Sequence, residues 1–231
     1  RVTSGNRLIV SDGAHLTATG TLTQPVVFAA EMDGSTDSNG KWDGIYVNKT
    51  GSASFIHTEI RQGGGGYNQP AALWVRSSNV SLQDVDIYHS WNDGVRISHT
   101  GTAATLENVT LRDNGRDGLV LNTLTGTVTL NSSAIYGNGR YGIHLDTTIL
   151  SGEEKPQDQT LTLTGVTVYS NTDAGLDIGR NRVRLHLGEE PRLDPGSLEQ
   201  RERVLRHRQR REPSIGHQQR LPDPGGLQRL R

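Results

Sequence analysis

The chain has 231 residues, enough for one or two ordinary domains, and a formal net charge of −1 at pH 7. It contains no cysteine, which excludes a disulfide framework and a zinc-ribbon site. No apolar run approaches the roughly 20 residues of a membrane-spanning helix, and no secretory apolar segment is present, so we expect no membrane span in this chain.

The small net charge conceals two regions of opposite sign. Residues 1–179 carry 11 Lys and Arg against 18 Asp and Glu, whereas residues 180–231 carry 13 Arg against 7 acids. Such a change in charge balance marks a boundary between a domain and a segment of different origin. The first region is rich in Gly, Thr, Ser and Asn, which favours a secreted or cell-surface protein of a bacterium.

The first segments are predicted to be extended. Leu8–Val10, Ala14–Ala18 and Pro25–Phe28 are short apolar or alternating runs separated by Gly, Asp and Thr, a pattern typical of strands. Asp33–Lys41 and Gly63–Pro70 are polar or glycine-rich and are predicted to be loops. Both leave the same corner of consecutive repeats.

A phrase of alternating apolar residues recurs at an interval of 24 residues between Val80 and Leu145. Its copies begin at Val80, Ala104 and Val128, and each leads into a second phrase in which a glycine precedes alternating apolar residues. A fixed period of this size indicates a solenoid, because one unit is too small to bury its own apolar side. The spacing is that of short strands with Gly, Asn and Asp corners. We therefore predict an all-β chain in which each repeat is one turn of a parallel β-helix.

The repeat ends near residue 179, after a polar insertion at Asp146–Gln159. Residues 180–231 contain no Phe, Trp, Tyr or Thr, and their Arg, Pro, Leu and Gln usage is typical of a GC-rich gene translated out of frame. We expect this Arg-rich tail to be disordered or non-native. The alternative for Arg201–Arg211 is a basic helix or nucleic-acid arm; no aromatic residue interleaves with its charge, so we expect no nucleic-acid partner.

Two stretches carry a resemblance to a known superfamily. Glu107–Leu119 and Asn131–Ile143 share the corner Asn-Gly-Arg-x-Gly, and they resemble the right-handed parallel β-helix repeats of the pectate-lyase-like superfamily. The resemblance covers roughly residues 8–179 and implies a right-handed parallel β-helix, which we assign to residues 1–179. It implies no single activity, because this architecture hosts lyases, glycosidases, epimerases, phage tailspikes and adhesins.

Alignment of the repeats predicts which side chains face outward. In the glycine phrase the outward column is Tyr46, Trp74, Arg96, Val120, His144 and Asp177, and the resemblance implies that a polysaccharide would lie along this face. Aromatic rings beside an arginine suit an acidic polysaccharide, since rings stack on sugars and a guanidinium pairs with carboxylates. In the other phrase the outward column is Arg61, Tyr88, Arg112, Tyr136 and Tyr169. This second column is predicted to be a surface ladder, with sugar binding as its alternative.

Carboxylates mark the start of the glycine phrase. Asp93 and Asp117 occupy equivalent positions in adjacent repeats, with Asp43 farther towards the N-terminus. Neighbouring coils lie about 5 Å apart, which suits a retaining glycosidase pair or an oxygen cage for Ca²⁺. Asp before Gly also suits a corner turn, and this is the interpretation we favour. If the protein is an enzyme, the candidate catalytic residues are Arg96, Asp93 and Asp117.

The remaining candidates lie at corners. Asn114, Asn138 and Asn171 are predicted to form a structural ladder of side-chain amides. His89 and Trp91, with the loop residue Tyr67, form a second candidate binding site. No His-x-His or His-x-x-x-His pair is present, so no metal centre is predicted; Ca²⁺ is the one cofactor left open.

Our leading hypothesis is a structural or binding module of a secreted or cell-surface protein. Its expected partners are a polysaccharide or cell-surface glycan and other domains of a longer surface protein, of which we expect this chain to be a fragment. The alternative is a polysaccharide lyase or glycoside hydrolase that acts along the outer face of one parallel sheet. A phage tailspike would need a trimerisation region in addition.

Overall fold

The computed structural model describes residues 2–3, 5–30, 41–66, 70–76, 79–98, 103–122, 126–146, 159–178, 183–188 and 192–193. Regular structure in this part of the chain is entirely β. The strands are β1 (Arg7–Val10), β2 (His15–Thr19), β3 (Val26–Phe28), β4 (Gly44–Val47), β5 (Ser52–Arg61), β6 (Ala71–Val75), β7 (Asn79–Tyr88), β8 (Asp93–Ser98), β9 (Ala103–Arg112), β10 (Leu119–Asn122), β11 (Thr127–Asn131), β12 (Ala134–Tyr136), β13 (Tyr141–Asp146), β14 (Gln159–Thr164), β15 (Thr167–Tyr169), β16 (Ala174–Ile178), β17 (Val183–Leu187) and β18 (Arg192–Leu193).

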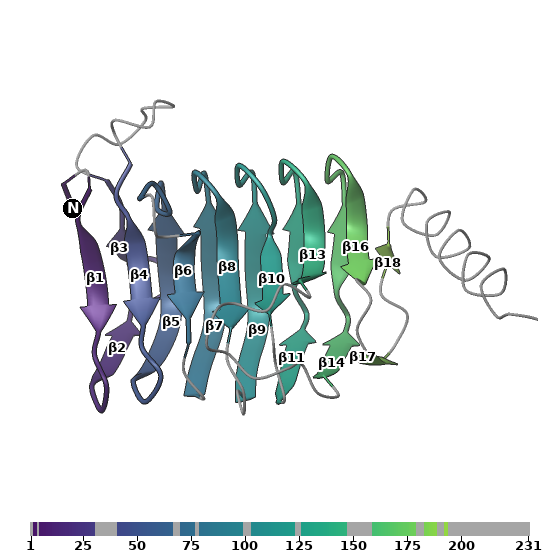
Figure 1. Cartoon of the computed structure of the whole chain (residues 1–231), viewed down its shortest axis with the longest axis horizontal. Coiled ribbons are helices and arrows are strands. Elements are labelled where there is room, and N and C mark those ends of the chain that lie inside the picture. The colour runs from purple at the N-terminus through teal and green to yellow at the C-terminus, as the bar shows by residue number, and fades with distance from the viewer. Residues whose placement is uncertain are drawn as a thin grey trace, which may run out of the picture.

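The strands form two parallel sheets. Sheet 1 has seven strands in the order β1-β4-β6-β8-β10-β13-β16, and sheet 2 contains the other eleven. Neighbouring strands in each sheet come from successive repeats, and Figure 1 shows them side by side along the long axis of the molecule, with β1 at one end and β16 near the other. This arrangement is a parallel β-helix, as the 24-residue period predicts.

The core is built from inward columns that run through successive coils. In sheet 1 the column is Ile45, Leu73, Val95, Leu119, Ile143 and Leu176, all buried and in register. In sheet 2 the matching column is Phe55, Leu82, Leu106, Leu130 and Leu163. Each fully buried side chain contributes roughly 1.5–3 kcal/mol of transfer free energy. The inward side chains of one coil are buried only because the coils before and after it cover them.

A column of left-handed residues explains why the apolar alternation skips one position in each repeat. His57, Asp84, Asn108 and Ser132 have φ values of 46°, 54°, 51° and 50°. They occupy the same place in successive coils, where the chain bends within or between the strands of sheet 2. Asn and Asp tolerate this conformation better than most side chains, and the bend returns the following residue to the core.

The predicted asparagine ladder is confirmed. Asn114 Nδ2 donates to Asn138 Oδ1 at 3.0 Å, and Asn138 Nδ2 donates to Asn171 Oδ1 at 2.9 Å. Each of the three amides also donates to a main-chain carbonyl of the preceding coil. The ladder meets Ser90 at its N-terminal end, where the backbone amide of Ser90 donates to Asn114 Oδ1.

The stack continues past the predicted boundary at residue 179, which is a correction. β17 pairs with β14 and β18 pairs with β15, both parallel, and Leu185 packs against the core. The physical reason is that Leu185 and Leu187 alternate in register with Leu161 and Leu163. Residues 194–231 lie outside the described part, so the predictions of disorder and of a frameshift there stay predictions.

Candidate functional site

The outer face of sheet 1 carries the predicted outward column. Tyr46, Trp74, Arg96, Val120, His144 and Asp177 are aligned by the strand register from β4 to β16. The alignment was predictable because the glycine phrase recurs at a fixed interval. The burial of these side chains was not predictable: Val120 is fully buried although it points outward in this register.

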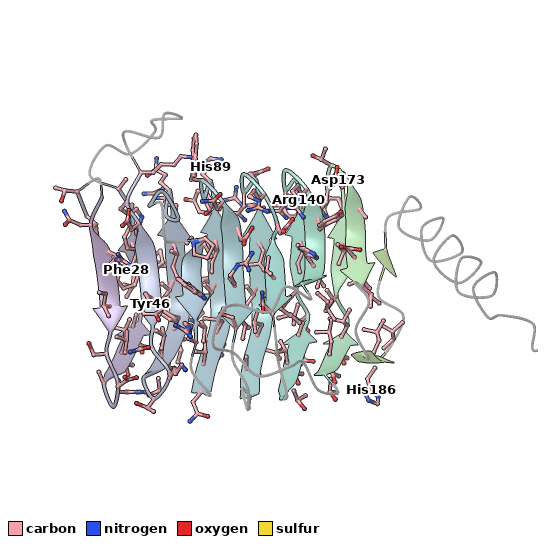
Figure 2. The ribbon with its side chains drawn as sticks, viewed as in Figure 1. Phe28, Tyr46, His89, Arg140, Asp173 and His186 are labelled. Carbon is pink, nitrogen blue, oxygen red and sulfur yellow. The ribbon has the colours of Figure 1, made fainter. Side chains whose placement is uncertain are left out.

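Two half-buried aromatic side chains stand next to each other at the N-terminal part of this face. The ring centroids of Tyr46 and Trp74 are 5.0 Å apart, with planes inclined by 56°. Trp74 Nε1 donates to Ser98 Oγ at 2.7 Å, and the Tyr46 hydroxyl lies 3.4 Å from a guanidinium nitrogen of Arg76. These bonds fix the orientation of both rings. Figure 2 labels Tyr46 on this part of the molecule.

Asp93 and Arg96 form a buried ion pair at the start of β8. Asp93 Oδ2 accepts from Arg96 Nε at 3.0 Å and from a terminal guanidinium nitrogen at 2.9 Å. Burial raises the pKa of the Asp93 carboxyl; Arg96 opposes this shift, and the charge of Asp117 adds to it. The other oxygen of Asp93 lies 3.4 Å from the backbone amide of Asp117 in the next coil.

Asp117 is also fully buried, but its surroundings favour the ionised form. Its carboxylate accepts the Tyr141 amide at 3.1 Å, contacts His144 Nδ1 at 3.1 Å and lies 3.5 Å from Arg140 Nε. Burial alone would raise the pKa of Asp117, but the hydrogen bonds from His144 and Tyr141 and the charge of Arg140 outweigh it, so the pKa is lowered. Two neighbouring carboxylates thus have pKa values shifted in opposite directions.

His144 joins three successive coils. Its Nδ1 faces Asp117, and its Nε2 lies 3.3 Å from Asp177 Oδ2 on β16. The sequence placed His144 and Asp177 in one outward column but did not reveal the contact with Asp117. Repeat alignment gives the position of a residue and not the direction in which its side chain reaches.

The three predicted catalytic residues therefore lie close together, and each already has hydrogen-bond or ion-pair partners within the fold. Asp93, Asp117 and Arg96 have buried side chains with partners in the same or the next coil. These bonds to corner amides agree with the corner-turn interpretation of Asp before Gly. Asp93 and Asp117 lie on adjacent coils, as the repeat predicts; their assignment as a catalytic pair stays a prediction.

The outward column of sheet 2 forms a continuous ladder. Arg61 donates to the Tyr88 hydroxyl at 3.0 Å, and the Arg112 guanidinium lies 4.1 Å from the centre of the Tyr88 ring. Tyr136 and Tyr169 stack at 4.8 Å with planes 14° apart. Arg112 also pairs with Asp86 at 2.8 Å. Mutual contacts of this kind are those of the predicted surface ladder.

A second cluster lies at the corner that precedes β8. Trp91 is 45% exposed, and the ammonium of Lys41 lies 4.9 Å from the centre of its ring. His89, also exposed, has φ of 53° and packs edge-on against Tyr88. Figure 2 shows His89, Arg140 and Asp173 along one edge of the molecule. Tyr67, the third predicted member of this cluster, lies outside the described residues.

The described residues offer no group of three or more His, Asp or Glu side chains suited to a metal ion. In the carboxylate column, Ala71 stands between Asp43 and Asp93, so the three predicted acids do not form one cage.

Within the same part of the chain, no helix has the length and apolarity needed to cross a membrane.

Two stacked parallel sheets, inward apolar columns and an asparagine ladder define this molecule as a β-helix solenoid. A family described as "Right handed beta helix region" matches residues 5–149, and the chain belongs to that family. No curated protein and no solved structure matches the chain. Family membership establishes the fold and its hand, whereas a function has to be argued from the side chains.

Proposed function

We propose that the protein is a binding module of the bacterial cell surface or secreted space, and that it binds polysaccharide along the outer face of sheet 1. The observation that carries the proposal is the Tyr46–Trp74 pair. Two rings 5.0 Å apart on adjacent strands, held by Ser98 and Arg76, offer a fixed apolar platform with polar groups at its edge. Sugar rings have apolar faces and polar rims that match such a platform.

A binding role agrees with the state of the ionisable groups beside the platform. Arg96 and Asp93 are buried and satisfy each other, and Asp117 is held by Tyr141 and His144. A general acid or base must reach the proton that it transfers, and these groups already have partners within the fold. They support a rigid face beside the aromatic pair.

The second candidate is a glycoside hydrolase or lyase, and one observation favours it. Asp93 and Asp117 sit on adjacent coils with pKa values shifted in opposite directions, which is the usual condition of an acid and base pair. The two candidates predict different products from the same incubation.

The test uses the full chain and a panel of neutral and acidic polysaccharides in affinity gel electrophoresis. We expect Trp74→Ala to weaken retention by one polysaccharide about tenfold, which corresponds to about 1.4 kcal/mol. Tyr169→Ala, on the face of sheet 2, serves as the matched control and is expected to bind normally. Unchanged binding by Trp74→Ala contradicts the proposal. New reducing ends or unsaturated products that disappear in Asp117→Asn would establish the enzyme instead.

A further inference from the structure

We infer that Tyr136 and Tyr169, on the outer face of sheet 2, are a site of oxidative cross-linking, at which a haem peroxidase and hydrogen peroxide join the two rings as dityrosine. The link ties one coil covalently to the next. It lies on the other sheet from the proposed polysaccharide face, and it does not depend on that function.

The two rings are held beside each other by the register of the strands. Tyr136 on β12 lies opposite Tyr169 on β15 in a parallel pair, and such residues stand about 4.8 Å apart. The ring centroids are 4.8 Å apart, and the ring planes differ by 14°. Because both residues belong to one backbone ladder, the folded chain itself keeps the rings in contact.

This is the one contact between two tyrosine rings in the part of the chain that the structure describes. The other described tyrosines contact different rings: Tyr46 lies against Trp74, Tyr88 against His89, and Tyr141 against His144. Within the sheet 2 column, Arg112 stands between Tyr88 and Tyr136. A radical formed on Tyr88 therefore has no tyrosine in the next coil with which to couple.

The pair is accessible to an oxidant, because Tyr169 is 41% exposed and Tyr136 is half-buried. The peroxidase takes one electron and the hydroxyl proton from each phenol, and the peroxide is reduced to two molecules of water. The two phenoxyl radicals then form one carbon–carbon bond between the ring positions beside their hydroxyl groups. The hydrogens at these positions move to the oxygens, which restores both phenols. The protein loses two hydrogen atoms in total.

A covalent link at this place supplies what the composition of the chain excludes. The chain has no cysteine, so no disulfide can join its coils. The loop that dityrosine closes contains the long segment between β13 and β14. Closing a long loop lowers the entropy of the unfolded chain, as a disulfide does. The cross-linked protein is therefore expected to resist unfolding better than the unmodified chain.

The experiment treats the full chain, at low protein concentration, with a haem peroxidase and hydrogen peroxide. Dityrosine is detected by its blue fluorescence, and intact mass with a denaturing gel separates an internal link from a dimer. Trypsin cleaves after Arg140, between the two tyrosines, and mass spectrometry of the linked peptides distinguishes Tyr169 from Tyr141 on the same side of the cleavage.

Four variants accompany the wild type, and circular dichroism confirms that each one folds. Tyr136→Phe and Tyr169→Phe each remove one phenol and keep the stacked ring. Tyr88→Phe, in the same column, and Tyr141→Phe, in the same peptide as Tyr169, are the matched controls.

We expect a monomer that is lighter by two hydrogen atoms, fluoresces as dityrosine and carries a link between Tyr136 and Tyr169. Tyr136→Phe and Tyr169→Phe should lose both the link and the fluorescence of the monomer, whereas Tyr88→Phe and Tyr141→Phe should keep them. The linked monomer should also unfold at a higher urea concentration than the untreated protein.

An internal link that persists in Tyr169→Phe, or one that maps to Tyr141, overturns the inference. Oxidation that joins only separate molecules also overturns it, since rings paired within one chain have the higher effective concentration and should couple first. An unchanged mass under conditions that convert free tyrosine to dityrosine overturns it as well.

Discussion

At the scale of single residues, polar side chains that hydrogen-bond between coils stabilise this fold in addition to the apolar core. Asn138 shows the pattern: its amide donates to Asn171 Oδ1 and to Leu111 O, and its oxygen accepts from Asn114. A buried amide with partners on both sides is stabilising because none of its polar atoms loses water without replacement. Asp93 and Asp117 extend the same principle to charged groups.

The two buried aspartates are expected to give opposite pH dependence of stability. The folded pKa of Asp117 lies below its ordinary value of 3.8, so the unfolded state binds more protons below that pH and the stabilisation is lost as pH falls. The folded pKa of Asp93 lies above 3.8. There the folded state binds more protons, and stability rises as pH falls through that range.

Urea unfolding followed by circular dichroism between pH 7 and pH 3 tests this. As pH falls, the difference in unfolding free energy between wild type and Asp117→Asn should shrink, and that between wild type and Asp93→Asn should grow. Asn replaces Asp with nearly the same shape in both variants, so each is the control for the other. Two differences with the same slope would show that the pKa assignments are wrong.

The sequence predicted the asparagine ladder because Asn recurs at one position of the repeat, and it predicted both outward columns because the recurring phrases around them fix the register. It did not predict the Asp117–His144–Asp177 contacts or the approach of Lys41 to Trp91. Those depend on side-chain rotamers and on a glycine corner in the intervening coil. The bend residues also escaped prediction, since His57, Asp84, Asn108 and Ser132 share no residue type.

At the scale of elements, the glycines at the start of β8, β10 and β13 are required by close packing of neighbouring coils. Gly94, Gly118 and Gly142 have negative φ, so left-handed geometry is not the reason for them. A Cβ on Gly142 would lie 2.6 Å from Gly175 O and 2.8 Å from Asn171 Nδ2, and would also overlap Val168. The glycine column thus lets the asparagine ladder and sheet 1 approach each other.

Gly142→Ala is therefore expected to destabilise the protein by roughly 1–3 kcal/mol, the usual cost of overpacking a core. The urea midpoint at neutral pH provides the measurement. Thr105→Ala, on an exposed position of sheet 2, is the control and should change the midpoint little. If Gly142→Ala matched the control, the coils would have to be able to move apart at this corner at low cost.

At the scale of the whole molecule, stability is a sum over coils and the interfaces between neighbours. Each coil covers the apolar residues of the one before it, so the last coil of a stack determines how much of its core is protected. Here β17 supplies part of that cover: Leu185 lies opposite Leu161 and packs against the core, and β18 continues the pairing beside β15. The sequence did not predict this coil because, after residue 180, the repeat pattern is reduced to a few alternating leucines among many arginines.

A comparison of chains that end at residue 179 and at residue 193 tests whether this last coil is part of the domain. The shorter chain loses the strands that pair with β14 and β15, which leaves Leu161 and Leu163 at an open edge. We expect it to unfold at lower urea, by on the order of 2 kcal/mol, and to aggregate more readily, since an unpaired edge invites association. The longer chain should match residues 1–231 in both respects. Equal midpoints for the two truncated chains would place the end of the cooperative stack at residue 179, because strands that contribute no stability are not part of it.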